Sequence, residues 1–182
     1  MVNYRRNKTG NPDDIFFLVF NTFKRTPWIA DLGCFDLLTG LMNRAECEFG
    51  VRFHAWVILP DHIHWLIQPG KADYSTVVSS FKKWATWRLK YQNIIRHTDK
   101  RWQDRFWEET IRDDDHYSNC VEYIHFNPVK HGLVESPWEW EFSSFRRFVK
   151  DGLYPQDWAS DMDLDNVTDK KLVMDVRGTK YD

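Results

Sequence analysis

Residues 51–68 read VRFHAWVILPDHIHWLIQ and contain two strand-like stretches separated by a proline. In the first stretch the side chains alternate, which is typical of a β-strand whose two faces meet different surroundings. One face is expected to carry Val51, Phe53, Ala55, Val57 and Leu59, and the other Arg52, His54, Trp56 and Ile58. Pro60 and Asp61 interrupt the alternation, and residues 62–68 form a second candidate strand. The sequence therefore predicts an antiparallel pair of strands here.

Five further elements are expected around this pair. They are a strand over 15–20, a helix over 28–46, a helix over 74–91, a strand over 102–111 and a helix over 115–127. Gly33 and Gly40 weaken the first helix, and Pro128 and Gly132 are expected to close the last one. The resulting order β, α, β, β, α, β, α predicts a single compact α+β domain. Its helices pack on a central antiparallel β-sheet, with ferredoxin-like topology as the nearest simple archetype.

Composition restricts the class of protein. The chain has 182 residues, of which 42% are hydrophobic and 29% charged, as in a globular protein of one domain. No apolar run approaches the roughly 18 residues that a membrane span needs. The N-terminus is polar and lacks the apolar core of a secretory signal, and the three cysteines form no C-x-x-C pair. We therefore expect a cytoplasmic protein with reduced thiols and no membrane partner.

Charge is distributed unevenly. The net charge of −2 by itself gives no support for a nucleic-acid partner. However, residues 81–112 hold nine basic and four acidic residues, a local balance of +5, whereas residues 151–182 hold eight aspartates and four basic residues, a balance of −4. A phosphate backbone can follow the basic segment. We expect a folded domain over 1–158 and an acidic C-terminal tail over 159–182.

Aromatic residues are unusually frequent, with ten tryptophans in the chain. Such an excess fits either a dense core or a surface on which bases stack. Within the basic segment, Trp84, Trp87, Trp102 and Trp107 interleave with lysines and arginines. The sequence leaves both interpretations open for each of them.

Two histidines form the first candidate site. His62 and His64 are two residues apart on a predicted strand, so their imidazoles project from the same face and can reach one ion. Ile63 points into the opposite layer. Taken alone the pair is a weak signal, since histidines on strand surfaces are commonly solvated or hydrogen-bonded.

Tyr123 and Asn127 form the second candidate site. Their four-residue spacing places a phenol and an amide on one face of the last helix. The alternative is that Tyr123 lies at the edge of the core and that Asn127 ends the helix before Pro128. Together with His62 and His64, however, the pair suggests a divalent cation that polarises a phosphate and a phenol that attacks it. The product would be a phosphotyrosine.

Several segments resemble a known family. LPDHIH at residues 59–64 resembles the histidine-hydrophobic-histidine motif of single-tyrosine HUH nucleases. WQDRFWE at 102–108 and YIHFNPVKHGLV at 123–134 resemble REP-associated tyrosine transposases. The resemblance covers nearly the whole chain before the acidic tail.

The resemblance implies an HUH nuclease fold and an enzyme that nicks and joins single-stranded or hairpin DNA from repetitive extragenic palindromes. By motif position, Tyr123 is the nucleophile, His62 and His64 are metal ligands, and Asn127 occupies the third-ligand position. The implied ion is Mg²⁺ or Mn²⁺. The tyrosine keeps the 5′ phosphate of the cut strand and leaves a free 3′ hydroxyl.

Candidate DNA contacts are basic or aromatic residues of the matching segments. They are Arg5, Arg6, Lys82, Lys83, Arg105, Trp107, Lys130 and His131. Two rival functions remain at this point, a non-cleaving DNA-hairpin-binding protein of the same ancestry and a small metallohydrolase. The sequence also leaves a monomer and a homodimer open.

Overall fold

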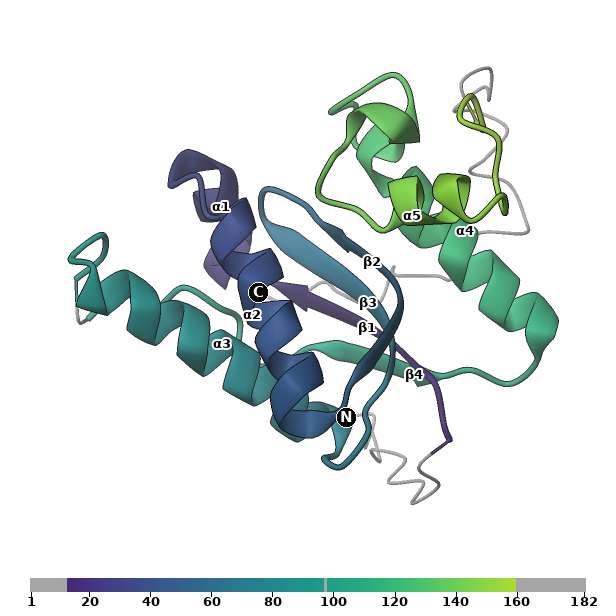
Figure 1. The fold of residues 1–182 in the computed structure, drawn as a ribbon. Helices are drawn as coiled ribbons and strands as arrows, with labels where there is room; N and C mark the ends of the chain where they lie inside the picture. The colour runs from purple at the N-terminus through teal and green to yellow at the C-terminus, as the bar shows by residue number, and fades with distance from the viewer. Residues whose placement is uncertain (1–12, 97, 160–182) are drawn as a thin grey trace, which may run out of the picture.

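The computed structural model describes residues 13–96 and 98–159, and its centre is a four-stranded sheet (Figure 1). The strands are β1 (Phe16–Asn21), β2 (Arg52–Ile58), β3 (His62–Gln68) and β4 (Trp107–Thr110). They lie in the order β2-β3-β1-β4, and every neighbouring pair is antiparallel. This is the order of a ferredoxin-like βαββαβ unit. The predicted α+β class with a central antiparallel sheet is confirmed.

Helices cover both faces of the sheet. The helices α2 (Phe35–Phe49) and α3 (Tyr74–Tyr91) lie on one face, and α4 (Asp114–Lys130) lies on the other (Figure 1). The central strand β1 requires this arrangement because its first five residues are all buried. Its alternate side chains therefore enter two separate cores.

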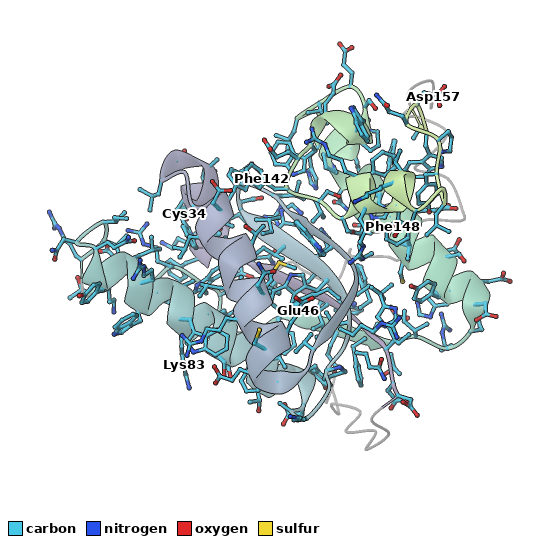
Figure 2. The ribbon with its side chains drawn as sticks, viewed as in Figure 1. Cys34, Glu46, Lys83, Phe142, Phe148 and Asp157 are labelled. Carbon is cyan, nitrogen blue, oxygen red and sulfur yellow. The ribbon has the colours of Figure 1, made fainter. Side chains whose placement is uncertain are left out.

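Short elements complete the fold. They are η1 (Phe23–Arg25), α1 (Trp28–Asp31), η2 (Pro137–Glu139) and α5 (Phe145–Lys150). Figure 2 shows Phe148 of α5 beside α4, and its ring lies 4.6 Å from the His125 ring. Across residues 13–96 and 98–159, no helix combines the length and the apolarity needed to cross a membrane.

The predicted bounds of two helices are wrong. The helix expected over 28–46 is broken into α1 and α2 by Gly33, whose φ of +60° is left-handed, whereas Gly40 lies inside α2. The last helix does not end at Pro128, which lies inside α4. It continues to Lys130 and ends before Gly132, whose φ is +65°.

The predicted faces of the second strand are also partly wrong. The register with β3 shifts between Phe53 and Ala55, which is a β-bulge. A bulge reverses the alternation, so the expected single face is divided between two cores. Val51 and Phe53 enter the core under α2 and α3, and Ala55, Val57 and Leu59 enter the core under α4.

The strand expected over 102–111 is shorter than predicted. β4 covers only Trp107–Thr110, and Trp102 makes an isolated bridge with Thr22. The Trp102 ring packs edge-on against Trp28 at 5.0 Å. Trp102 is therefore a core residue.

Candidate active site

β3 presents two histidines to the side of the sheet that α4 covers. Ile63 and Trp65 belong to the opposite core, so His62 and His64 share one face, as the alternation predicts. Their ring centroids are 4.9 Å apart. Both side chains are buried, and the His64 ring lies 5.5 Å from the Tyr123 ring of α4. The fold thus brings the two sequence-predicted sites together.

His62 is oriented by a carboxylate and an arginine. Its Nδ1 lies 2.6 Å from Asp61 Oδ1, and Asp61 Oδ2 lies 2.8 Å from Arg25 Nε. Burial lowers the pKa of His62 to about 4, although the hydrogen bond to Asp61 opposes this shift. The imidazole is therefore neutral at pH 7. With the proton on the Nδ1 that faces Asp61, Nε2 keeps a lone pair for a ligand.

His64 is more deeply enclosed. Its side chain is buried, and neither ring nitrogen has a hydrogen-bond partner among the described residues. Burial, followed by the positive charges of nearby side chains, holds the pKa of His64 well below its ordinary value. A neutral imidazole without a partner is costly in a core, and it is the form that binds a metal ion.

Tyr123 lies on α4 over the same face. Its ring packs edge-on against Phe17 at 6.0 Å, which fixes its position above the sheet. Lys130 Nζ lies 4.7 Å from the centroid of the ring. Within the described part of the chain, the Tyr123 hydroxyl has no hydrogen-bond partner. The phenol is thus held by packing, next to a positive charge.

Asn127 is fully buried one turn after Tyr123. Its Nδ2 donates a hydrogen bond of 2.8 Å to the Tyr123 carbonyl. Its Oδ1 has no partner in the described residues. Asn127 is not among the residues that line the pocket described next.

A pocket of about 780 Å³ opens beside His62, His64 and Tyr123. Its other lining residues are mostly basic or aromatic. The basic ones include Lys24, Arg25, Lys100, Arg105 and Lys130, and the aromatic ones are Phe23, Phe106 and Trp107. Asp104 is the one acidic residue of this lining. The pocket therefore suits a negatively charged ligand with planar groups.

The rim of the pocket is conformationally strained at η1. Lys24 and Arg25 have φ values of 55° and 56°, a left-handed conformation that costs a non-glycine residue about 1–3 kcal/mol. Arg25 is held there by Asp61 and by a 2.7 Å hydrogen bond from its Nη1 to Asn21 Oδ1. The strained turn thus aims Arg25 at the carboxylate that orients His62.

The predicted DNA contacts fall into three groups. Arg105, Trp107, Lys130 and His131 line the pocket, and the His131 ring lies 4.9 Å from the His62 ring. Arg5 and Arg6, like nearly all of the predicted acidic tail, lie outside the described residues. The third group, on α3, is not among the residues that line the pocket.

That third group is Lys82 and Lys83. Lys82 turns inward, and its Nζ donates a hydrogen bond of 2.8 Å to the Gln103 carbonyl. Burial lowers the pKa of Lys82 to about 8, against the opposing effect of Asp104. The Lys82 ammonium is therefore already engaged inside the protein. Lys83 is exposed.

Two residues that support His62, Asp61 and Arg25, are not predicted from the sequence. The signal for Asp61 is its position directly before the candidate ligand His62, because carboxylates are common partners of metal-bound histidines. Arg25 carried no such signal, because it is distant in sequence and meets Asp61 only in the fold.

The donor set fits a divalent cation. Two neutral imidazoles and one unpartnered amide oxygen are buried around Tyr123. In residues 13–96 and 98–159, no three His, Cys, Asp or Glu side chains gather as a metal-binding group. A metal site here therefore depends on the two histidines and on a neutral oxygen, with positions left for phosphate and water.

Comparison with known proteins identifies the family. The sequence model of the IS200-like transposases matches residues 15–127, which include both histidines, Tyr123 and Asn127. The chain belongs to the IS200-like transposase family. This IS200-like transposase is therefore an enzyme that acts in DNA transposition, and its family implies a requirement for a divalent metal ion.

Relatives narrow the comparison within the family. The transposase is 44% identical over 130 residues to the REP-associated tyrosine transposase of Escherichia coli (strain K12), which covers 70% of this chain and 74% of that protein. It is 42% identical over 180 residues to a Haemophilus influenzae protein that carries the same family name, covering 90% of this chain and 97% of the relative. The resemblance read from the sequence is confirmed.

A solved structure agrees with the fold. It is that of a REP-associated tyrosine transposase bound to a REP hairpin. The two chains are 32% identical and superpose with a TM-score of 0.75, over 90% of this chain and 93% of the other. The likeness extends beyond the segment that the family shares.

Proposed function

We propose that this transposase nicks and rejoins single-stranded or hairpin DNA of the REP type, with Tyr123 as the nucleophile. The observation that carries the proposal is the placement of the Tyr123 ring 5.5 Å from the buried and unpartnered His64, in a pocket with a basic rim. The relatives support the choice of substrate, since one of them is a transposase bound to a REP hairpin.

His62 and His64 would hold the metal ion, with Asn127 Oδ1 as the third protein ligand. Mg²⁺ and Mn²⁺ suit a set of two imidazoles, one amide oxygen and phosphate oxygens. When bound, such an ion supplies Lewis-acid polarisation of the scissile phosphate. Asp61 and Arg25 fix the orientation of His62 through its Nδ1 and would leave its Nε2 free to bind such an ion.

The chain itself supplies the nucleophile and its surroundings. The Tyr123 oxygen bonds to phosphorus, the bond from phosphorus to the 3′ oxygen breaks, and the phenolic proton ends on the released 3′ hydroxyl. The Lys130 ammonium beside the ring favours the negative charge that develops on the phenolic oxygen. In the reverse step a 3′ hydroxyl attacks the phosphotyrosine, and Tyr123 recovers its proton. The energy of the phosphodiester is thereby conserved.

The pocket lining positions the DNA strand. Arg105, Lys130 and His131 are expected to contact phosphates, and Trp107 to stack on a base. Arg5 and Arg6 remain sequence-based predictions for the same role. We expect the protein to work in the cytoplasm, as a monomer or a homodimer.

The test is whether a covalent adduct forms between the protein and DNA. The protein is incubated with labelled hairpin DNA carrying an unpaired extension and with Mg²⁺ or Mn²⁺, and is then denatured and separated by electrophoresis. We expect a DNA-linked band that Tyr123→Phe abolishes. Tyr154→Phe is the matched control, because Tyr154 packs against α5 and does not line the pocket.

Other outcomes would support the rival functions. Cleavage without an adduct, or an adduct that survives Tyr123→Phe, would contradict the nucleophile and favour a metallohydrolase. Binding without any cleavage would favour a hairpin-binding protein that has lost catalysis.

A further inference from the structure

α3 carries an exposed surface that the active site does not use. The surface consists of the exposed Lys83, Trp87, Arg88 and Tyr91 and the half-buried Lys90, and we call it the α3 surface. Lys83, Trp87 and Tyr91 follow each other at four-residue spacing, so they form one stripe along the helix. Figure 2 shows Lys83 on the outer side of α3, and α3 lies across the sheet from α4.

The aromatic pair of this surface is unusually open to solvent. Trp87 is 60% exposed and Tyr91 is 68% exposed, and their rings stack at a centroid distance of 5.2 Å with an interplanar angle of 16°. By contrast, Trp84 on the same helix is covered by Arg44 and stacks on Phe49. A stacked pair of this kind leaves aromatic faces free for a further planar group.

The charged side chains of α3 all have the same sign. α3 contains no aspartate or glutamate. No ion pair or hydrogen bond with the described part of the chain engages the side chains of Lys83, Arg88 or Lys90. Lys82 differs, because its ammonium is turned inward to the Gln103 carbonyl. Three free cations around exposed rings match a ligand that is both anionic and aromatic.

We propose that the α3 surface binds an unpaired segment of DNA outside the strand held in the pocket. One base stacks on the Trp87–Tyr91 pair, and phosphates contact Lys83, Arg88 and Lys90. The proposal rests on the proposed function for the nature of the substrate, and it adds a second contact region on the far side of the sheet. Trp, Tyr and Arg are also common at protein–protein interfaces, but lysine is depleted there, so the two lysines of the surface favour DNA over a protein partner.

The experiment measures binding by fluorescence anisotropy, with EDTA present so that no strand is cut. The probes are a labelled REP-type hairpin with an unpaired extension and the same hairpin with a blunt end. We expect the double variant Trp87→Ala/Tyr91→Ala to bind the extended hairpin about tenfold more weakly, because one stacked base contributes roughly that factor. Its affinity for the blunt hairpin should not change.

The salt dependence of DNA binding tests whether the cationic side chains contact phosphates. Lys83→Ala should lower the slope of log affinity against log salt by about 0.7 for the extended hairpin, as expected for one lost phosphate contact on a single strand. Lys150→Ala, an exposed lysine of α5, is the matched control and should leave the DNA affinity and its salt slope unchanged.

Two further variants separate stacking from folding. Leu153→Ala removes a side chain that is 64% exposed elsewhere and should leave DNA binding unchanged. Trp87→Phe keeps an aromatic ring at this position and should bind the extended hairpin with most of the wild-type affinity. Because Trp87 and Tyr91 are largely exposed, the double variant should melt at the wild-type temperature.

Clear results would overturn the proposal. Unchanged affinity for the extended hairpin would exclude the surface, and equal weakening for both hairpins would assign it to duplex DNA. A wild-type dimer in sedimentation that the double variant abolishes, without a change in DNA binding, would assign it to self-association.

Failure of the proposed function is read separately. The double variant should form the Tyr123 adduct on a short unpaired oligonucleotide at the wild-type rate. If the wild type forms no adduct but the variant still loses affinity for the extended hairpin, the chemistry fails and the α3 surface stands.

Discussion

The two faces of the sheet are both buried, but they are built differently. Under α2 and α3, Trp65 of β3 packs edge-on against Phe20 and Phe81, with ring centroids 4.7 Å away in each case. Under α4, the preceding residue of the same strand is His64, whose two nitrogens lack partners in the described part of the chain. One strand therefore serves a hydrophobic core on one side and a reactive site on the other.

The difference indicates which face of the sheet contributes less to the stability of the fold. An unsatisfied buried polar group costs about 1–3 kcal/mol, whereas aromatic packing contributes favourably. Such groups occur on both faces, but they differ: both nitrogens of His64 and Oδ1 of Asn127 lie on the α4 face, whereas on the α2/α3 face they include the indole nitrogens of Trp65 and Trp102, whose large rings pack against other aromatic rings. We infer that the α2/α3 face stabilises the fold and that the α4 face is maintained for binding and catalysis.

The largest expected effect lies on the α2/α3 face. Trp65→Ala should lower the free energy of unfolding by about 3–5 kcal/mol, because it leaves a cavity between Phe20, Phe53 and Phe81. Urea denaturation followed by circular dichroism measures the change. A loss below 1 kcal/mol would show that this face does not carry the stability.

The next effect concerns the metal ion and the α4 face. Saturating Mg²⁺ or Mn²⁺ should raise the melting temperature of the wild type by about 5–10 °C at a hundred times the dissociation constant. His64→Leu should show no such shift, since it removes a proposed ligand.

Without metal, His64→Leu should melt at or above the wild-type temperature, because it removes two unsatisfied nitrogens from a buried position. A destabilised His64→Leu variant would contradict the idea that this face gives up stability for function.

A smaller effect is expected from the support of His62. Asp61→Ala should weaken metal binding by about 10–100-fold, because Nδ1 loses the carboxylate that orients the ring. Isothermal titration calorimetry with Mn²⁺ measures the affinity. Asp99→Ala is the control, since Asp99 pairs with Arg101 and does not line the pocket. Equal affinities for all three proteins would remove Asp61 from the site.

The smallest effect comes from the one lysine that turns inward from α3. Burial lowers the pKa of Lys82 to about 8 in the folded protein, from about 10.5 when unfolded. Between these pH values the unfolded chain binds more protons, so the free energy of unfolding should rise with pH. The rise is at most about 1.4 kcal/mol per pH unit.

Lys82→Met isolates this dependence. The difference in unfolding free energy between the wild type and the variant should increase in favour of the wild type from pH 8 to pH 10, measured by urea denaturation. A constant difference over this range would mean that Lys82 keeps its ordinary ionisation in the fold.

Local patterns predicted most of the elements. Alternation and apolar runs located β1 and β3 and the shared face of His62 and His64, because strand periodicity is a property of neighbouring residues. Helical spacing located α3 in the same way, and the capping aspartates at 113–115 located the start of α4. The same patterns gave wrong helix ends at two places. Gly33, with its left-handed φ, separates α1 from α2, whereas α4 continues through Pro128.

Other features arise from contacts between segments far apart in the chain. The bulge before Ala55 follows from the register that β2 adopts on β3, so alternation within β2 predicted the wrong face for Phe53. The inward turn of Lys82 depends in the same way on where the Gln103 carbonyl lies.

The candidate site shows the same division. The residue types and their spacing suggest Tyr123, His62 and His64 as one chemical set, and the resemblance to a transposase family implies their individual roles. Their approach across the sheet, the arginine behind Asp61 and the exposure of Trp87 depend on packing between α3, α4 and the strands. Such packing is set by the shapes of distant surfaces in three dimensions, which the linear order of residues does not contain.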